Sequence, residues 1–414
     1  MGGGADEGWA KIMKLAKGPG MINLGQGFPD FVPELVSKVI RPAAQKSIDS
    51  VPECQYSPMR GHGRLRKAIV SLRWALYGED IDEENVCVVC SGTEAIFATI
   101  QALVNPGDEV VLFEPFFPWY LAAIRMAGGK AVVIELKPPL FAIQNDDVER
   151  AFSTNTKLCI LNSPHNPTGH MVNTKELDII AKFCAKFDAL LVSDEVYEVC
   201  SFDPKQRSHL TASQHSEDMR KRTLTLGSAS KLLSLTGWRV GWVSGPAELV
   251  SAVSAAHSYM TFCAPTPLQI GIAAGIECAI GSEKDSRDRE KAPSTPLEIT
   301  KAFGDLGGVF YTNWTILSKA IESIGLKVCK AEGGYFLICD VSVSGLTDME
   351  FCTWLMKTHK IVGIPLSLFY AEPKKTDRYL VRFAVCKTRK AIERAAAAMS
   401  KVDIGVAKAP AKGA

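Results

Sequence analysis

The chain lacks the features that would place it in a specialised class of protein. Cysteine is sparse and scattered, with 12 residues in 414, about 3% against the ~8–10% of a disulfide scaffold. Basic and acidic residues nearly balance at 47 and 45, so there is no basic stripe of the kind that binds nucleic acids or membrane surfaces. No run approaches the ~18 apolar residues of a membrane helix, and the N-terminus lacks the apolar stretch of a signal peptide. We therefore expect a cytoplasmic protein without nucleic-acid or membrane partners.

Metal-binding motifs are missing as well. The seven histidines form no HExxH motif and no Cys/His cluster. Cys87 and Cys90 have CxxC spacing, but they lie in the β-branched run VCVVC, where residues three apart point to opposite faces of a strand. We expect neither a metal site nor a redox pair there.

What the chain does have is an ordinary globular composition, 47% hydrophobic, and a length typical of two or three domains. From about residue 86, short β-branched runs alternate with longer helical stretches. The predicted strands are Val86–Cys90, Val110–Phe113, Ala131–Leu136, Leu158–Leu161, Leu190–Ser193, Leu224–Leu226 and Val240–Val243, and the predicted helices include Glu94–Val104, Pro118–Ala127 and Thr174–Phe187. This alternation predicts an α/β fold with a mostly parallel central sheet flanked by helices.

The pattern changes after about residue 245, where it becomes mainly helical. The charged stretch Gly281 to Pro296 is typical of a solvated helix or loop. From about Phe310 the pattern predicts a second, smaller α+β unit. Its predicted elements are a helix through Ile324, strands at Leu326–Cys329 and Tyr335–Cys339, a helix at Asp348–Thr358, a strand at Tyr379–Ala384 and a closing helix.

Polar residues follow several of the predicted strands, at the edge of the sheet where α/β proteins bind ligands. Ser91-Gly92-Thr93-Glu94 begins a helix and offers backbone N–H groups and hydroxyls to an anion, although a plain N-cap is the simpler explanation of this segment alone. In NSPHNPTG, two prolines and a glycine fix a turn that presents Asn166. An Asx-turn is the structural alternative for that asparagine.

Two further strand ends carry ionisable groups. Asp194 ends a buried run, so we expect it to have a cationic or protonated partner, with Tyr197 in the same crevice; a helix N-cap is the alternative for Asp194. Lys231 stands among small hydroxyl residues, and Arg239 follows eight residues later. Ser228-x-x-Lys231 also matches the SxxK motif of serine acyl-transfer enzymes, but the companion motifs SDN and KTG do not follow it.

One ligand needs all of these groups together. Pyridoxal 5'-phosphate (PLP) requires a phosphate cradle, a lysine for its aldehyde, a carboxylate for its pyridine nitrogen and donors for its phenolic oxygen. A helix terminus offers only about half a unit charge against the nearly two charges of a phosphate monoester. We therefore expect Arg239 to supply the missing positive charge.

Several motifs together resemble the fold-type I, class I/II aminotransferases, and within them the group of kynurenine aminotransferase, glutamine transaminase K and cysteine-S-conjugate β-lyase. These motifs are NLGQGFPDF, QYSPMRGHGRLRKAI, GDEVVLFEPFFPWY, NSPHNPTG, SDEVY, GSASKLLSLTGWRVGW and LVRFAVCK, and they extend over nearly the whole chain. Any one of them would be weak evidence alone.

The resemblance implies a role for each matching residue. Lys231 matches the Schiff-base lysine that later shuttles a proton, Asp194 matches the partner of the pyridine nitrogen, and Tyr197 and Asn166 match the donors to the phenolic oxygen. The other matches are phosphate ligands (Gly92, Thr93, Ser228, Arg239 and, from a second subunit, Tyr56), the aromatic ring that stacks on the cofactor (Phe117), the grip on the substrate carboxylate (Arg382, with Gly27 nearby) and the substrate side-chain pocket (Trp9, Phe262). Without the resemblance, Phe117 could be a core aromatic and Arg382 a surface strand residue.

The resemblance also implies an overall organisation. We expect a large PLP-binding domain over residues 40–300, a small domain built from residues 1–39 and 301–414, and a homodimer with shared active sites.

The expected reaction moves the amino group of a large neutral or aromatic amino acid, of the kynurenine, glutamine, phenylalanine or methionine type, to a 2-oxo acid. Alternatives are a cysteine-S-conjugate β-lyase, another class I aminotransferase and, remotely, a non-catalytic ligand-binding protein on the same fold. Thr93 and Cys263 depart from some relatives and leave the substrate open.

Overall fold

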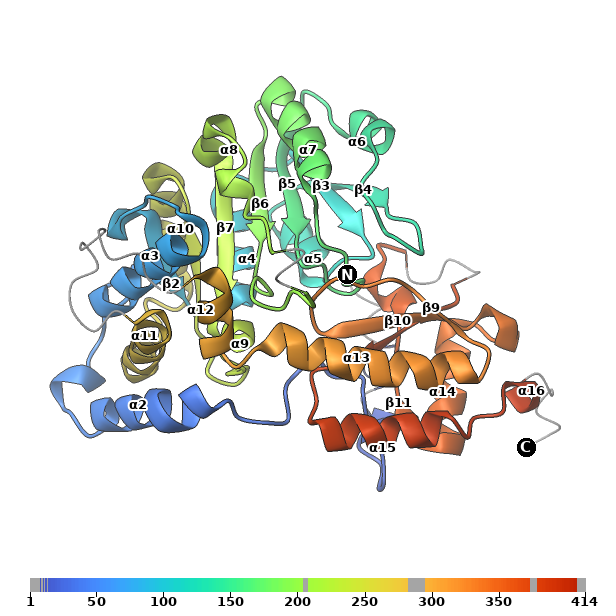
Figure 1. Ribbon diagram of the computed structural model, residues 1–414. Helices are drawn as coiled ribbons and strands as arrows, with labels where there is room; N and C mark the ends of the chain where they lie inside the picture. Colours follow the sequence, from blue (N-terminus) through green and yellow to red (C-terminus); the bar gives the residue numbers. More distant parts are fainter. Residues whose placement is uncertain are drawn as a thin grey trace.

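The computed structural model describes residues 8, 10, 12, 14–203, 208–281, 295–372 and 378–407. Its largest element is a seven-stranded sheet (Figure 1) with the strand order β2-β8-β7-β6-β5-β3-β4. The bounds are β2 (Val86–Val89), β3 (Glu109–Glu114), β4 (Lys130–Glu135), β5 (Thr156–Asn162), β6 (Leu190–Asp194), β7 (Thr223–Ser228) and β8 (Gly241–Ser244). Within this sheet β8 runs antiparallel to β2 and β7, and the other pairings are parallel.

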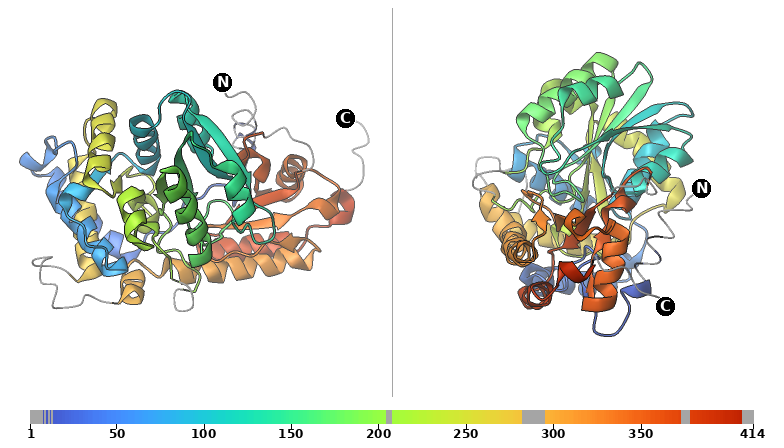
Figure 2. Two further views of the ribbon diagram at one scale, coloured as in Figure 1. Left: turned by 90° about the horizontal axis from the view of Figure 1, so that it is seen from above. Right: turned by 90° about the vertical axis from the view of Figure 1, so that its right-hand side faces the viewer.

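Helices cover both faces of this sheet (Figure 2). Alternate residues of one strand belong to different packed cores: Val110 and Leu112 of β3 lie in one, and Val111 and Phe113 lie in the other. The first core is completed by α4 (Gly92–Leu103), α5 (Trp119–Met126) and α10 (Ala247–Met260), and the second by helices that include α3 (Gly63–Tyr77), α6 (Asn145–Ala151), α7 (Thr174–Phe187), α8 (Glu217–Arg222) and α11 (Thr266–Ile280). A strand buried on both faces must be apolar at successive positions, which explains the continuous β-branched runs.

The C-terminal part forms a four-stranded antiparallel sheet in the order β12-β13-β10-β9. Its strands are β9 (Lys327–Val328), β10 (Phe336–Asp340), β12 (Ile364–Pro365) and β13 (Leu380–Ala384), and its helices include α13 (Leu306–Ser323), α14 (Asp348–His359) and α15 (Arg389–Met399). The N-terminal strand β1 (Ile22–Asn23) pairs in parallel with β11 (Ile361–Val362). Segments from the N-terminal and C-terminal parts of the sequence therefore lie side by side in one part of the molecule (Figure 1).

The remaining helices are α2 (Arg41–Ile48), α9 (Ala229–Leu232), α12 (Pro296–Ala302) and α16 (Ile404–Ala407). In the described residues, no helix is long and apolar enough to cross a membrane.

The strand and helix predictions are confirmed, with ends that differ by a few residues. The prediction that Cys87 and Cys90 face opposite sides of the strand is confirmed, because Cys87 packs in one core and Cys90 against the other. Most of the charged stretch from Gly281 to Pro296 lies outside the described residues. The domain boundaries at 39/40 and 300/301 stay a prediction.

A buried ionic cluster lies beside the end of β6. The Arg73 side chain, 2% exposed, contacts three carboxylates: its Nε donates to Glu79 at 2.5 Å, and its Nη1 donates to Glu195 and Glu198 at 3.3 Å. Burial alone would raise the pKa of Glu195, but the nearby His209 and Arg73 outweigh it and hold that pKa at about 2. The cluster ties α3 to the segment that directly follows Asp194.

Replacing Arg73 with methionine is expected to destabilise the protein by roughly 3–5 kcal/mol, because buried carboxylates would be left without their cation. Urea unfolding at pH 7 measures this loss. The control is Lys38→Met, which removes an exposed ion pair with Glu34 that is expected to contribute little to stability. Equal losses in the two variants would show that the cluster does not hold the fold together.

Candidate active site

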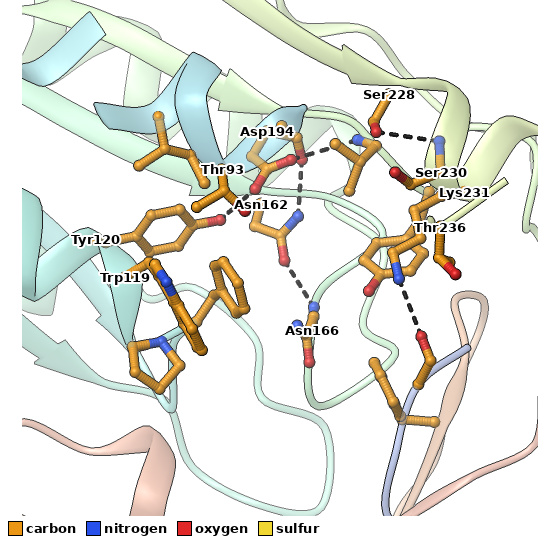
Figure 3. Close-up of a pocket in the computed structure, with 18 of the residues that line it drawn as sticks. Thr93, Trp119, Tyr120, Asn162, Asn166, Asp194, Ser228, Ser230, Lys231 and Thr236 are labelled. Carbon is orange, nitrogen blue, oxygen red and sulfur yellow. Dashed lines mark hydrogen bonds between the residues drawn. The ribbon is translucent and has the colours of Figure 1, made fainter. Parts of the chain in front are cut away.

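A pocket opens at the carboxyl ends of β5, β6 and β7, where the seven-stranded sheet faces the C-terminal sheet. It brings together side chains from distant parts of the sequence (Figure 3). The lining residues are Gly27, Gly92, Thr93, Ile96, Phe117, Pro118, Trp119, Tyr120, Asn162, Asn166, Asp194, Val196, Tyr197, Ser228, Ser230, Lys231, Thr236, Arg239, Phe336, Phe369 and Arg382. Most of the residues predicted from the strand ends are among them.

Lys231 lies on α9, a single helical turn directly after β7. Its Nζ donates to the backbone oxygen of Gly27 at 3.0 Å, a bond that joins the N-terminal segment to the large sheet (Figure 3). Burial lowers the pKa of Lys231 to about 8, and the positive charges of Arg382 and Arg239 act in the same direction. A part of this amine is therefore neutral, and able to accept a proton, near physiological pH.

Asp194 ends β6, in register with Asn162 of β5. One carboxylate oxygen accepts a hydrogen bond from the Tyr120 hydroxyl, and the other accepts from the Val196 N–H at 3.4 Å. Burial raises the pKa of Asp194 to about 6, in spite of these donors. A buried carboxylate with only neutral donors gains most from a protonated nitrogen of a ligand.

Arg382, on β13, is buried at 4% exposure, so it is not a surface strand residue. Its Nη1 donates to Asn166 Oδ1 at 3.1 Å and its Nη2 donates to the Gly25 oxygen at 3.0 Å, while its Nε has no partner in the described residues. The guanidinium lies 3.9 Å from the centre of the Phe336 ring. Since the described part of the chain offers it no carboxylate within ion-pair distance, this cation is available for an anionic ligand.

Small residues and hydroxyl groups form the opposite side of the pocket. Gly92 begins α4, after the N-cap Ser91, and Ser228 caps α9. A Cβ on Gly241 of the neighbouring strand would lie 2.7 Å from the Gly92 nitrogen, so only glycine allows β8 to pass this close to the start of the helix. The Ser230 hydroxyl is buried without a partner in the described residues. Helix N-termini, free hydroxyls and Arg239 form a suitable cradle for a phosphate.

Two predicted residues lie away from the pocket. Tyr56 is 84% exposed and Phe262 is 42% exposed, and their rings pack edge to face at 5.3 Å. Phe262 has a φ of 67°, with a hydrogen bond from the Cys263 nitrogen to the Thr261 oxygen at 2.8 Å. This is a strained γ-turn, and Phe262 is not among the described residues that line the chain's own pocket. Trp9 lies outside the described residues.

The sequence analysis missed several lining residues. Asn162 is the last residue of β5, and its Nδ2 donates to the Asp194 backbone oxygen at 2.8 Å, so the same strand-end argument could have found it. The sequence indicated Trp119 and Tyr120 less clearly than Asn162, because they only follow Phe117 at the start of a predicted helix. The aromatic residues Phe336 and Phe369 had none, since a ring in an apolar stretch predicts only a core position.

Fold and site together define an α/β enzyme that presents a buried lysine amine, a buried carboxylate and a buried arginine in one pocket. The chain matches the sequence profile of the class I and II aminotransferases over residues 19–399, and it belongs to that family. It is therefore a transaminase.

Known proteins resemble it over most of its length. Human kynurenine–oxoglutarate transaminase 3 is 34% identical, over 94% of this chain and 86% of its own. YbdL of Escherichia coli, identified as a methionine aminotransferase, has a similar structure with a TM-score of 0.84 and 30% identity, over 95% of this chain and 97% of its own. N-succinyldiaminopimelate aminotransferase of Mycobacterium tuberculosis gives a TM-score of 0.83 and 34% identity, over 95% and 96%.

Replacing Lys231 with methionine is expected to stabilise the cofactor-free protein at pH 7. The pKa of this lysine falls from 10.5 to about 8 on folding, so the cost of burying the charged amine grows as the pH falls from 10.5 to 8 and is complete below 8. The expected gain is on the order of 3 kcal/mol at pH 7 and vanishes above pH 10.5. Chemical unfolding at several pH values measures it, with the exposed Lys319→Met as the control. A gain that does not depend on pH would contradict burial of the charge.

Proposed function

We propose that this transaminase uses PLP to move the amino group of a large neutral or aromatic amino acid to a 2-oxo acid. The observation that carries the proposal is the position of Lys231, whose amine lies in the same pocket as the buried side chains of Asp194 and Arg382. In the described residues none of the three has an ion-pair partner, and their hydrogen bonds go to neutral groups. A cofactor with a basic nitrogen, together with a substrate that carries a carboxylate, would supply the missing charges.

The residues present fit PLP. When bound, PLP supplies a carbonyl group that takes up the amino group and a protonated ring that withdraws electrons from it. Asp194 would hold the proton on the ring nitrogen, and Asn166 and Tyr197 would donate to the phenolic oxygen. The phosphate would accept from the backbone and hydroxyl donors at Gly92, Thr93 and Ser228 and from Arg239, and the orphaned hydroxyl of Ser230 adds a donor to this cradle.

Lys231 Nζ is the group that we assign to proton transfer. With a pKa of about 8, its neutral form can remove the proton from the substrate α-carbon. Its charged form can then give a proton to the cofactor carbon that carries the amino group. The bond to the Gly27 oxygen holds the amine in the pocket until a ligand displaces it.

Arg382 would bind the α-carboxylate of both substrates. Its planar guanidinium is fixed by Asn166 and Gly25 and flanked by the rings of Phe336 and Phe369, at 3.9 and 4.6 Å. A fixed guanidinium sets the direction of the carboxylate, and thereby the direction of the α-carbon relative to Lys231.

The pocket favours substrates with a large neutral side chain. Among its described lining residues the cations are Lys231, Arg239 and Arg382, and each has a role that leaves no positive charge for a second substrate carboxylate. The remaining wall includes Ile96, Phe117, Trp119, Phe336 and Phe369, with the Phe117 and Trp119 rings stacked at 4.6 Å. The names of the human and Escherichia coli relatives, kynurenine and methionine transaminases, support this choice.

We also propose a homodimer in which Tyr56 reaches the phosphate of the partner's site and Phe262 lines the partner's substrate pocket. Both rings are exposed and packed together on one surface. The strained turn at Phe262 supports this role, because strain of this kind is typical of residues that a functional contact requires.

The first test replaces Lys231 with alanine. Transamination of an aromatic donor is expected to fall by roughly 10³-fold or more, since both the amine that holds the cofactor and the proton carrier are lost. Borohydride treatment of the PLP-loaded wild type is expected to attach the cofactor to Lys231, which peptide mass spectrometry detects. Lys319→Ala serves as the surface control. A Lys231→Ala protein that transaminates at the wild-type rate would overturn the proposal.

The second test replaces Arg382 with lysine, which keeps the charge and loses the planar fork. The KM of both the amino acid and the 2-oxo acid is expected to rise by roughly 10- to 100-fold, with a smaller effect on kcat. Steady-state kinetics with a panel of neutral, aromatic and acidic donors measures this and ranks the donors as well. Unchanged KM values would place the carboxylate elsewhere.

A further inference from the structure

The backbone around Lys231 is held by a tyrosine from the opposite sheet. Because α9 (Ala229–Leu232) is a single turn, most of its carbonyl groups lack an intrahelical donor. The hydroxyl of Tyr335 donates to the backbone oxygen of Lys231 at 3.2 Å. Tyr335 comes directly before β10 of the C-terminal sheet and is fully buried.

The ring of the same tyrosine faces the lysine amine. Lys231 Nζ lies 4.9 Å from the centre of the Tyr335 ring and 5.6 Å from that of Tyr197. At these distances the face of an aromatic ring attracts an ammonium group, most strongly where water is excluded. Tyr335 therefore contacts Lys231 at both ends, at its backbone and at its amine.

Tyr335 itself is fixed by its surroundings. Its ring packs edge to face against Tyr197 and Phe310, with centres 5.0 and 4.9 Å away. Its backbone oxygen accepts from the Val385 nitrogen at 2.8 Å. A ring held on several sides cannot turn away from the lysine, whereas the lysine side chain has free rotation about several bonds.

We propose that Tyr335 is a positioning residue for Lys231, whose hydroxyl fixes the lysine turn and whose ring holds the charged amine in the pocket. Tyr335 is not among the residues that line the pocket, so it acts through the lysine and not on a substrate. The inference rests on the proposed function, in which Lys231 carries the proton. In this way a residue beside the C-terminal sheet influences the position of the reactive lysine beside the seven-stranded sheet.

The ring also opposes the effect of burial on the amine. Burial lowers the pKa of Lys231 to about 8, and a ring that stabilises the ammonium form limits that fall. Removing the ring is expected to lower the pKa further, whereas removing only the hydroxyl leaves the ring in place. The two parts of the side chain can therefore be tested separately.

The experiment compares Tyr335→Phe and Tyr335→Leu with the wild type. The control is Tyr370→Phe, because Tyr370 is also a buried tyrosine that contacts a cation, with Arg378 lying 3.4 Å from its ring centre, but it does not line the pocket. Two measurements are made: kcat and KM of the PLP-loaded enzymes, and the pKa of Lys231 in the cofactor-free proteins, from the pH dependence of its labelling by trace acetic anhydride relative to Lys387.

Tyr335→Phe is expected to lower kcat roughly tenfold, the effect of one lost hydrogen bond to a turn that must stay in place. Both KM values should stay within about twofold and the pKa within about 0.3 units, since the substrates are not contacted and the ring remains. Tyr335→Leu is expected to lower the pKa by about one unit as well. Tyr370→Phe should change none of these quantities.

Three results would overturn the inference: an unchanged kcat in Tyr335→Phe, an unchanged or raised lysine pKa in Tyr335→Leu, or equal effects in Tyr370→Phe. If Tyr335→Leu does not fold, the nearly isosteric Tyr335→Phe decides the question by its kcat and KM. The labelling needs no catalytic activity, so failure of the proposed function, seen as a wild type without transamination, is distinguishable from failure of this inference.

Discussion

Burial of the Lys231 amine near Arg239 and Arg382, with no carboxylate of the described residues at ion-pair distance, is the constraint on which the site depends. Burial lowers the pKa of this amine to about 8, and the contacts that compensate come from distant parts of the chain. The Gly27 oxygen accepts a hydrogen bond from the amine, and the face of the Tyr335 ring lies 4.9 Å from it. The amine is therefore held only when the N-terminal segment and the C-terminal sheet are both docked on the seven-stranded sheet. The Lys231 side chain therefore links the proposed chemistry to the docking of these two parts of the chain on the seven-stranded sheet.

Two successive carboxylates show how the same strand end serves stability and chemistry. Asp194 has only neutral donors, and burial raises its pKa to about 6. Glu195 is equally buried, yet His209 and Arg73 hold its pKa at about 2. One group is left in need of a ligand, while its neighbour is fully compensated by the protein. Environments that separate the pKa values of adjacent groups in this way are typical of catalytic sites.

How far the sequence could predict this site depends on the physical signal each residue carries. Asp194 ends β6, and Asn166 and Lys231 come shortly after β5 and β7. A polar group at or just after the end of a buried run is unusual enough to be noticed. Phe336 and Phe369 line the pocket without any such signal, because an aromatic ring in an apolar stretch has the same pattern in a core. Tyr335 was predicted only as the first residue of a strand. Its contact with Lys231 joins positions that are far apart in the chain, which local patterns do not encode.

The sequence by itself determined the parts that depend on local periodicity and covalent order: the strands and helices, the α/β class, the groups at the strand ends and, through combined motifs, the transaminase family. Only the tertiary structure decided which of these groups are buried, which lack partners and which face outward. Arg382 proves to be a buried cation with no carboxylate partner among the described residues, and Phe262 an exposed ring on a strained turn. The reason is that desolvation and pairing depend on every neighbour in space, and those neighbours come from segments hundreds of residues apart.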